Sequence, residues 1–192
     1  MIRRLYDWTI ELAQSRFALW ALAVVAFVES SVFPIPPDVL MIPMILARPS
    51  RAWLIAGIAL VASVLGGLLG YYIGAVLYDS VGRPVLEFYG KSAEAEAFRQ
   101  SFNDWGAWAV LIAGMTPFPY KVITILSGVT GLSMPVFMIA SVVARGLRFF
   151  IVAGLLWKFG APIRDFIERR LGLLFALFLV LLLGSFYLVK FL

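Results

Sequence analysis

Two proline-rich stretches interrupt apolar runs: Phe33-Pro34-Ile35-Pro36-Pro37-Asp38-Val39 and, 83 residues later, Thr116-Pro117-Phe118-Pro119-Tyr120-Lys121-Val122. Both follow the pattern x-Pro-x-Pro-x-charge-Val, with the acid Asp38 in one copy and the base Lys121 in the other. Proline ends a helix because it lacks a backbone donor and clashes with the preceding turn. A repeat of proline-broken half-helices with opposite charges at matching positions is typical of secondary transporters.

The composition predicts an all-α integral membrane protein. Of the 192 residues, 62% are hydrophobic and 14% are charged, and the mean hydropathy is +0.97. Soluble domains are near half apolar and a quarter charged. The length suits one membrane domain with roughly four to six hydrophobic segments of about 20 residues each.

Several classes of function are excluded by what the sequence lacks. It contains no cysteine and no histidine, which excludes disulfides, thiol redox chemistry, Cys/His zinc sites and histidine-based catalysis. Any proton coupling must therefore use carboxylates. The net charge of +5 is scattered over short loops without interleaved aromatic residues, so no nucleic-acid partner is expected. No cofactor or metal site is predicted.

The first half of the chain is predicted to form a re-entrant hairpin followed by a membrane span. Residues 39–47 form an apolar run of nine residues, about 14 Å of helix against a hydrocarbon core of about 30 Å. A helix this short cannot cross the membrane alone, so a re-entrant hairpin with both ends on the same side of the membrane is predicted. Its irregular tip is tolerated where protein or water surrounds it. In the following span, Gly66, Gly70 and Gly74 recur every fourth residue and predict a close helix-packing face.

The second half repeats this order. Residues 79–106 are polar and predict an amphipathic connector helix that follows a turn at Gly82-Arg83-Pro84. The single predicted membrane domain comprises an interfacial amphipathic helix at 1–16, hairpin 1 at 17–47, spans at 52–78, 134–157 and 171–191, the connector at 79–106, and hairpin 2 at 107–130. The hairpin tips are Pro34, Pro36 and Pro37 in the first copy, and Pro117 and Pro119 in the second.

The offset of 83 residues places residues 17–78 over residues 107–158. A hairpin plus one span crosses the membrane an odd number of times, so the second copy inserts upside down, as an inverted repeat. A cytoplasmic N-terminus and an external C-terminus satisfy the positive-inside rule, with nine bases inside against four outside. The inside bases are Arg3, Arg4, Arg16, Arg48, Arg51, Lys158, Arg164, Arg169 and Arg170; the outside ones are Arg83, Lys91, Arg99 and Lys190.

Five charged residues lie within or between the apolar stretches: Glu29, Asp38, Lys121, Arg145 and Arg148. Each costs about 2.5–3.5 kcal/mol at a lipid-facing helix centre, so a polar cavity between the two tips is expected. Arg145 and Arg148 share a helix face, and the guanidinium fork suits phosphate. Glu29 is the favoured proton carrier, since burial favours a neutral carboxyl group.

The sequence allows two interpretations of the role of these charges, a functional one and a structural one. In the functional one, they bind an anionic substrate and carry a proton, and the meeting tips bring Asp38 and Lys121 into direct contact. In the structural one, they are ion pairs that fix one hairpin against the other.

Four segments together resemble the DedA family, also called the SNARE-associated or VTT-domain superfamily, and most closely its YqaA-like branch. They are Glu29-Ser-Ser-Val-Phe-Pro-Ile-Pro-Pro-Asp38, Gly114-Met-Thr-Pro-Phe-Pro-Tyr-Lys121, Ser127-Gly128 and Arg145-x-x-Arg148-Phe149-Phe150. The resemblance covers roughly residues 17–160. It departs at Gly114-Met115-Thr116, where many members have Gly-Arg-Phe, and at Lys121, which replaces an arginine.

The resemblance implies a multi-pass protein of the bacterial inner membrane that acts as a lipid flippase or scramblase and is not an enzyme. Its implied partners are membrane lipids, undecaprenyl phosphate or a phospholipid, together with protons. The family's acids carry over to Glu29 and Asp38, its hairpin base to Lys121, and its downstream arginine to Arg145 or Arg148. A proton- or ion-coupled small-solute transporter is the main alternative; an intramembrane enzyme and an assembly role are weaker ones.

Overall fold

The computed structural model describes residues 17–32, 36–116 and 118–189, with the backbone alone for residues 161 and 163–189. Within these ranges the chain is helical and contains no strand, which confirms the predicted all-α class. The predicted interfacial helix at 1–16 and the tip residues Pro34 and Pro117 lie outside the described residues.

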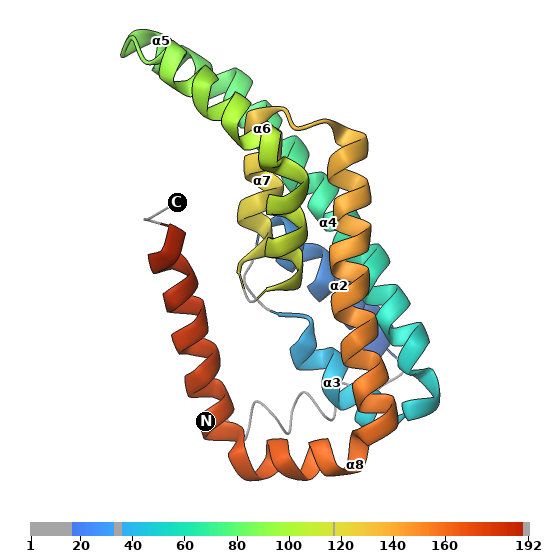
Figure 1. Ribbon diagram of the computed structural model, residues 1–192. Helices are drawn as coiled ribbons and strands as arrows, with labels where there is room; N and C mark the ends of the chain where they lie inside the picture. Colours follow the sequence, from blue (N-terminus) through green and yellow to red (C-terminus); the bar gives the residue numbers. More distant parts are fainter. Residues whose placement is uncertain (1–16, 33–35, 117, 190–192) are drawn as a thin grey trace.

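Seven α-helices of the described chain are joined by short turns and two irregular helical segments (Figure 1). The α-helices are α2 (Ala18–Ser31), α3 (Asp38–Ala47), α4 (Ala52–Leu77), α5 (Arg83–Phe88), α6 (Ser92–Met115), α7 (Tyr120–Thr130) and α8 (Met134–Val189). The irregular segments are the 3₁₀ helix η1 (Pro49–Arg51) and the π-helix η2 (Tyr78–Gly82).

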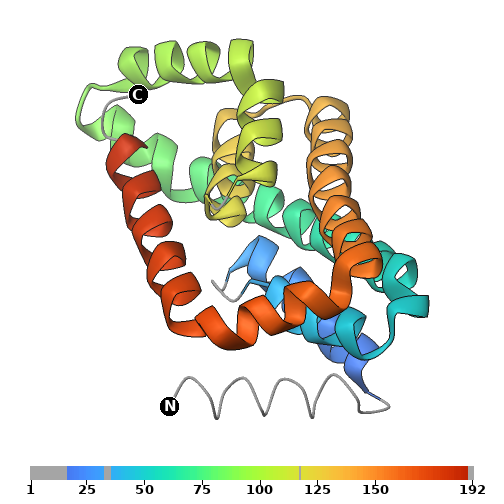
Figure 2. The same cartoon turned by 60° about the horizontal axis from the view of Figure 1, so that its bottom comes forward.

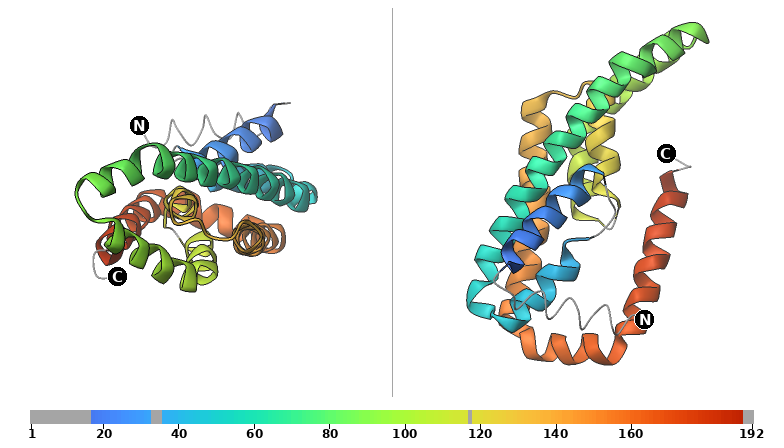
Figure 3. Two further views of the ribbon diagram at one scale, coloured as in Figure 1. Left: turned by 90° about the horizontal axis from the view of Figure 1, so that it is seen from above. Right: turned by 180° about the vertical axis from the view of Figure 1, so that it is seen from behind.

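The two proline-rich stretches lie between helices that reverse direction. Helix α2 rises to its end at Ser31 and α3 descends again, while the end of α6 descends and α7 rises (Figures 1 and 3). The two helix pairs therefore enter from opposite ends of the molecule, and their tips meet near its middle. Contact between the tips is direct, because Thr124 of α7 donates a hydrogen bond to the Ser30 carbonyl at 3.1 Å.

Helix α4 packs against both helix pairs through the predicted glycine face. A Cβ atom at Gly66 would overlap the backbone of Phe27 on α2, and one at Gly74 would overlap the backbone of Ile125 on α7. Only glycine allows helix backbones to approach this closely. The packing role expected for these glycines is confirmed.

The predicted turn at Gly82-Arg83-Pro84 is wrong. The chain continues from α4 through the π-helix into α5, and it reverses at Gly90, whose φ of 66° favours glycine. Pro84 lies in the first turn of α5, where a missing backbone donor costs nothing. Helix α6 is continuous, so the predicted boundary between connector and second hairpin at residues 106 and 107 falls inside one helix.

Two helical stretches of the described part are long and apolar enough to cross a membrane: Pro49–Phe88 and Met134–Gly160. Beyond the second stretch, α8 changes direction and its last part stands away from the other helices (Figure 2). Pro162 lies inside α8, and an interior proline kinks a helix. The predicted span at 171–191 is helical as far as Val189, and its side chains lie outside the description.

The interior has two apolar clusters, one for each helix pair. The lower cluster unites α2, α3, the start of α4 and a later part of α8, with Leu22, Met41 and Phe149 fully buried. The upper cluster unites α6, α7 and the start of α8, with Val110, Tyr120 and Phe137 fully buried. Buried polar side chains include Ser30, Ser63, Thr124, Ser141 and Arg145. These polar groups gather where the two clusters meet.

Candidate functional site

Arg145 of α8 is a buried cation with several polar partners. Its Nε donates to the Ser63 hydroxyl at 2.6 Å, and one Nη donates to the Glu29 carboxylate at 2.6 Å. The Ser30 hydroxyl bridges this group, 2.7 Å from Ser63 Oγ and 3.0 Å from the Glu29 carboxylate. Burial of a charge is tolerated only with such pairing, and no buried side-chain polar atom of the described residues lacks a partner.

Two aromatic rings lie against the same guanidinium. Its central carbon lies 4.8 Å from the Tyr120 ring centroid and 4.7 Å from the Phe149 ring centroid. Tyr120 belongs to the upper apolar cluster and Phe149 to the lower one. With only 1% of its side chain exposed, Arg145 joins the two halves of the molecule.

Arg148, one turn further along α8, forms the second ion pair and bridges the two tips. One Nη donates to the Asp38 carboxylate at 2.7 Å, and the other donates to the Thr116 carbonyl at 2.9 Å. Asp38 begins α3 and Thr116 ends α6, so one guanidinium holds both proline-rich tips. This pair is more accessible than the first, with 23% of the Arg148 side chain and 18% of the Asp38 side chain exposed.

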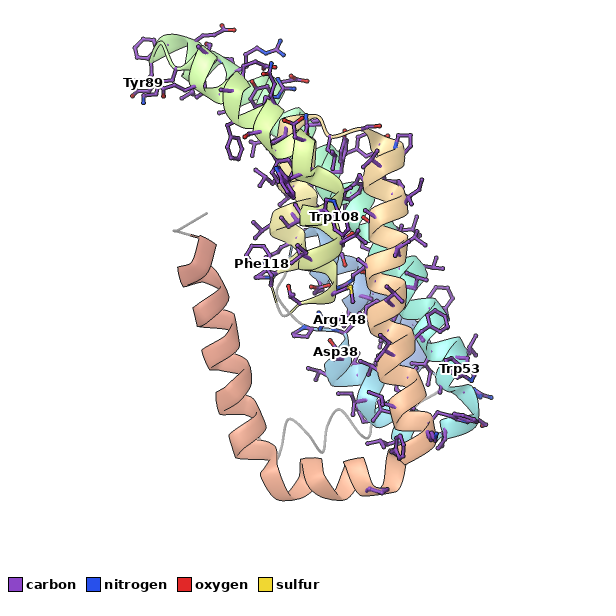
Figure 4. All side chains as sticks on the ribbon, in the orientation of Figure 1. Asp38, Trp53, Tyr89, Trp108, Phe118 and Arg148 are labelled. Atoms are coloured by element: carbon purple, nitrogen blue, oxygen red, sulfur yellow. The ribbon has the colours of Figure 1, made fainter. Side chains whose placement is uncertain are left out.

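Asp38 and Arg148 face the side on which the last part of α8 lies, and Phe118 of the second tip lies toward the same side (Figure 4).

Lys121 does not pair with Asp38, and the direct contact predicted between them is wrong. Asp38 pairs with Arg148 instead, and the Lys121 ammonium donates to the Val32 carbonyl at 3.2 Å. Val32 is the C-terminal cap of α2, where a cation is favourable because free carbonyls carry partial negative charge. Lys121 of the second tip therefore contacts the end of α2 directly, whereas Asp38 of the first tip is linked to the second tip only through Arg148.

The charges of the site sum to +1. Glu29 neutralises Arg145 and Asp38 neutralises Arg148, while Lys121 has no carboxylate partner among the described residues. Lys121 is partly exposed, so its charge is available to a ligand. The arrangement favours an anion, and the described residues hold no group of three His, Cys, Asp or Glu that would bind a metal ion.

All five charged residues predicted from the sequence are in this region, and the structure adds residues that the sequence did not single out. Ser63 and Tyr120 contact Arg145, and the Thr116 carbonyl binds Arg148. Ser63 is a polar residue within the apolar span 52–78, which is the signal that would have identified it. Of the tip prolines, Pro36 and Pro37 directly precede α3, and Pro119 directly precedes α7.

Comparison with known proteins identifies the family. The model of the VTT domain matches residues 35–158 of this chain. The chain belongs to the VTT-domain family. This match confirms the resemblance to the DedA, or VTT-domain, superfamily.

Bacterial relatives support the assignment. An uncharacterized protein of Haemophilus influenzae is 40% identical over 168 residues, covering 85% of this chain and 87% of the relative. An uncharacterized protein of Histophilus somni is 38% identical over 168 residues, again covering 85% of this chain and 87% of the relative. An uncharacterized membrane protein of Mycobacterium leprae is 25% identical over 151 residues, covering 76% of this chain and 64% of the relative. No solved structure matches.

The chain is thus a membrane protein of the VTT-domain family. The matched region contains both bases that bridge the tips, Lys121 and Arg148, together with Asp38 and Arg145. Helix α2, with Glu29, precedes it.

Proposed function

We propose that this VTT-domain protein is a flippase or scramblase that moves a phosphate-bearing lipid, undecaprenyl phosphate or a phospholipid, across the bacterial inner membrane. The observation that carries the proposal is Arg148, a partly exposed guanidinium that holds both tips at the point where they meet. A site with a net charge of +1 at that point suits a lipid phosphate.

In this proposal the two helix pairs are re-entrant hairpins inserted from opposite membrane faces. The observed helix boundaries support an inverted repeat. An offset of 83 takes α3 to residues 121–130, beside the observed α7, and takes α4 to 135–160, beside the apolar first part of α8. Helices as short as α3 and α7 reach only about half-way across a hydrocarbon core of about 30 Å.

The two arginines have different roles. Arg148 and Lys121 are the proposed substrate contacts, because both are accessible and both hold the tips only through groups that a phosphate oxygen can replace. Arg145 is a positioning residue, because its side chain is buried against two aromatic rings and already donates hydrogen bonds to Ser63 and Glu29. Glu29 serves as the counter-charge of Arg145.

In this proposal the proton carrier is Asp38 rather than Glu29. A phosphate that binds Arg148 displaces the Asp38 carboxylate from its guanidinium. The displaced Asp38 carboxylate, which lies at the more accessible of the two ion pairs, is the proposed proton acceptor. Substrate entry and proton uptake are therefore linked through one side chain, and release of the substrate restores the ion pair.

The test is translocation by purified protein in vesicles. Fluorescent phosphatidylethanolamine and labelled undecaprenyl phosphate are assayed separately, with and without a pH gradient. Asp38→Asn and Arg148→Gln are expected to lower the rate at least tenfold, since each removes one side of the tip bridge. The matched control is Asp79→Asn, which breaks an exposed ion pair with Arg83 far from the tips and should keep the wild-type rate.

Size-exclusion profiles and thermal unfolding establish that each variant is folded. Folded Asp38→Asn and Arg148→Gln proteins that move both lipids at the wild-type rate would overturn the proposal. So would a folded wild-type protein that moves neither lipid.

A further inference from the structure

The lower end of the molecule in Figure 1 is the end where α3 stops and α4 begins. Three aromatic rings form a cluster on its outer surface, here called the aromatic triad: Trp53 of α4 with Phe150 and Trp157 of α8. The Trp53 and Phe150 rings are stacked, with centroids 6.0 Å apart and an interplanar angle of 19°. The Trp53 and Trp157 centroids are 6.1 Å apart. Phe150, Gly154 and Trp157 share one face of α8, and a Cβ at Gly154 would lie 3.5 Å from the Trp53 ring. The Trp53 ring thus packs over Gly154, at ordinary van der Waals distance.

The triad is an outward surface and not part of the core. Trp53, Phe150 and Trp157 are 48%, 37% and 54% exposed, whereas Ala153 and Leu156 beside them on α8 are buried. Trp53 lies at the edge of the bundle away from Asp38 and Arg148 (Figure 4). The triad is therefore separate from the site between the tips.

Three cations surround this end of the molecule. Arg51 caps the N-terminus of α4 two residues before Trp53, Lys158 directly follows Trp157, and Arg48 ends α3. All three are exposed, and the segment Pro49–Arg51 packs against α8. None of the three forms an ion pair among the described residues, where Glu29 and Asp38 are already paired with Arg145 and Arg148.

The opposite end also exposes aromatic side chains but has the opposite charge. Phe88 and Tyr89, at the tip of the arm formed by η2, α5 and the first half of α6 (residues 78–104), are 84% and 70% exposed (Figure 4). The arm carries five acids, Asp79, Glu87, Glu94, Glu96 and Asp104, against three bases, Arg83, Lys91 and Arg99. Each of these bases is in an ion pair with an acid of the arm. Unpaired cations beside exposed rings are thus a feature of the lower end.

We propose that the aromatic triad, Arg51 and Lys158 form a site for an anionic phospholipid of the leaflet at the lower end, outside the translocation path. Tryptophan rings prefer the membrane interface, where the indole contacts both the glycerol region and the acyl chains. Unpaired arginine and lysine beside them attract an anionic head group. A second copy of the chain is a poor occupant, because a two-fold contact through this surface would place the same cations against each other.

The test uses tryptophan quenching by lipids with brominated acyl chains. A variant that keeps Trp53 and Trp157 and replaces the other four tryptophans with phenylalanine is placed in vesicles with small amounts of brominated phosphatidylglycerol or brominated phosphatidylcholine. Quenching by phosphatidylglycerol is expected to exceed that by phosphatidylcholine. A variant that keeps only Trp108, which is half-exposed on α6, should show no preference.

Removal of the cations gives the decisive comparison. Arg51→Gln and Lys158→Gln should each reduce the preference roughly fivefold. The matched control, Arg83→Gln with Lys91→Gln, removes two cations from the arm and should leave the preference for phosphatidylglycerol unchanged. Equal quenching of the triad tryptophans Trp53 and Trp157 by both lipids, or a preference that survives Arg51→Gln with Lys158→Gln, would overturn the proposal.

A second measurement avoids the tryptophan substitutions. Native mass spectrometry of otherwise unchanged protein should show phosphatidylglycerol retained by the wild type and lost from the Arg51→Gln, Lys158→Gln variant; equal retention would also contradict the site. Translocation by this variant is expected to keep the wild-type rate, so the lipid site and the proposed transport function can fail independently.

Discussion

At the scale of single residues, Arg145 and Arg148 show how two arginines one turn apart on the same helix differ. Arg145 is 1% exposed and pairs with Glu29, while Arg148 is 23% exposed and pairs with Asp38. The loss of one member of a buried pair leaves an uncompensated charge, which costs about 3–5 kcal/mol. A partly exposed pair costs less, because water solvates the remaining charge.

Arg145→Gln is therefore expected to destabilise the protein by about 3–5 kcal/mol, and Arg148→Gln by clearly less. Urea unfolding in detergent micelles measures both. The double variant Glu29→Gln, Arg145→Gln should recover part of the lost stability, because it leaves no unpaired charge. Equal destabilisation by the two single arginine variants would contradict the separation into a positioning residue and a substrate contact.

At the scale of helices, the glycines of α4 have contrasting surroundings. A Cβ at Gly74 would overlap the Ile125 backbone on α7, whereas a Cβ at Gly57 meets nothing within 4 Å. Gly74→Ala should lower stability by about 1–3 kcal/mol, as overpacking does, because two backbones must separate. Gly57→Ala is the matched control in the same helix and should be neutral or stabilising by up to about 1 kcal/mol. Thermal unfolding measures both, and a tolerated Gly74→Ala would contradict the close approach of α4 and α7.

The helices also show which features the sequence could predict. The proline-rich tips and the glycine face were predictable because proline and glycine constrain the backbone locally. The end of the arm was not, because Gly82 and Pro84 are compatible with both a turn and a helix start, and the chain reverses at Gly90 instead. The partners of the charges were not predictable either. The cost of burying a charge identified Asp38 and Lys121 as candidate site residues. Which base pairs with Asp38 depends on how α8 is rotated about its own axis, and in the structure this rotation brings Arg148 to Asp38.

At the scale of the whole molecule, the charge distribution predicts the orientation in the membrane. The lower end carries Arg48, Arg51 and Lys158, which form no ion pair with another described side chain, and the arm at the upper end carries an excess of acids. Because cytoplasmic loops are enriched in lysine and arginine, the lower end is expected to face the cytoplasm. The chain has no cysteine, so each introduced cysteine is a single reporter.

Ser50→Cys lies in the exposed segment Pro49–Arg51 at the lower end, and Ser133→Cys lies exposed between α7 and α8 at the upper end. In intact cells, a membrane-impermeant maleimide should label Ser133→Cys and should label Ser50→Cys only after the membrane is disrupted. The exposed Ser92→Cys at the start of α6 should behave like Ser133→Cys, because both lie at the upper end. The reverse labelling pattern would invert the topology. Labelling of both ends in intact cells would contradict a transmembrane arrangement of α4 and the first part of α8, and with it the opposed entry of the two hairpins on which the proposed lipid path depends.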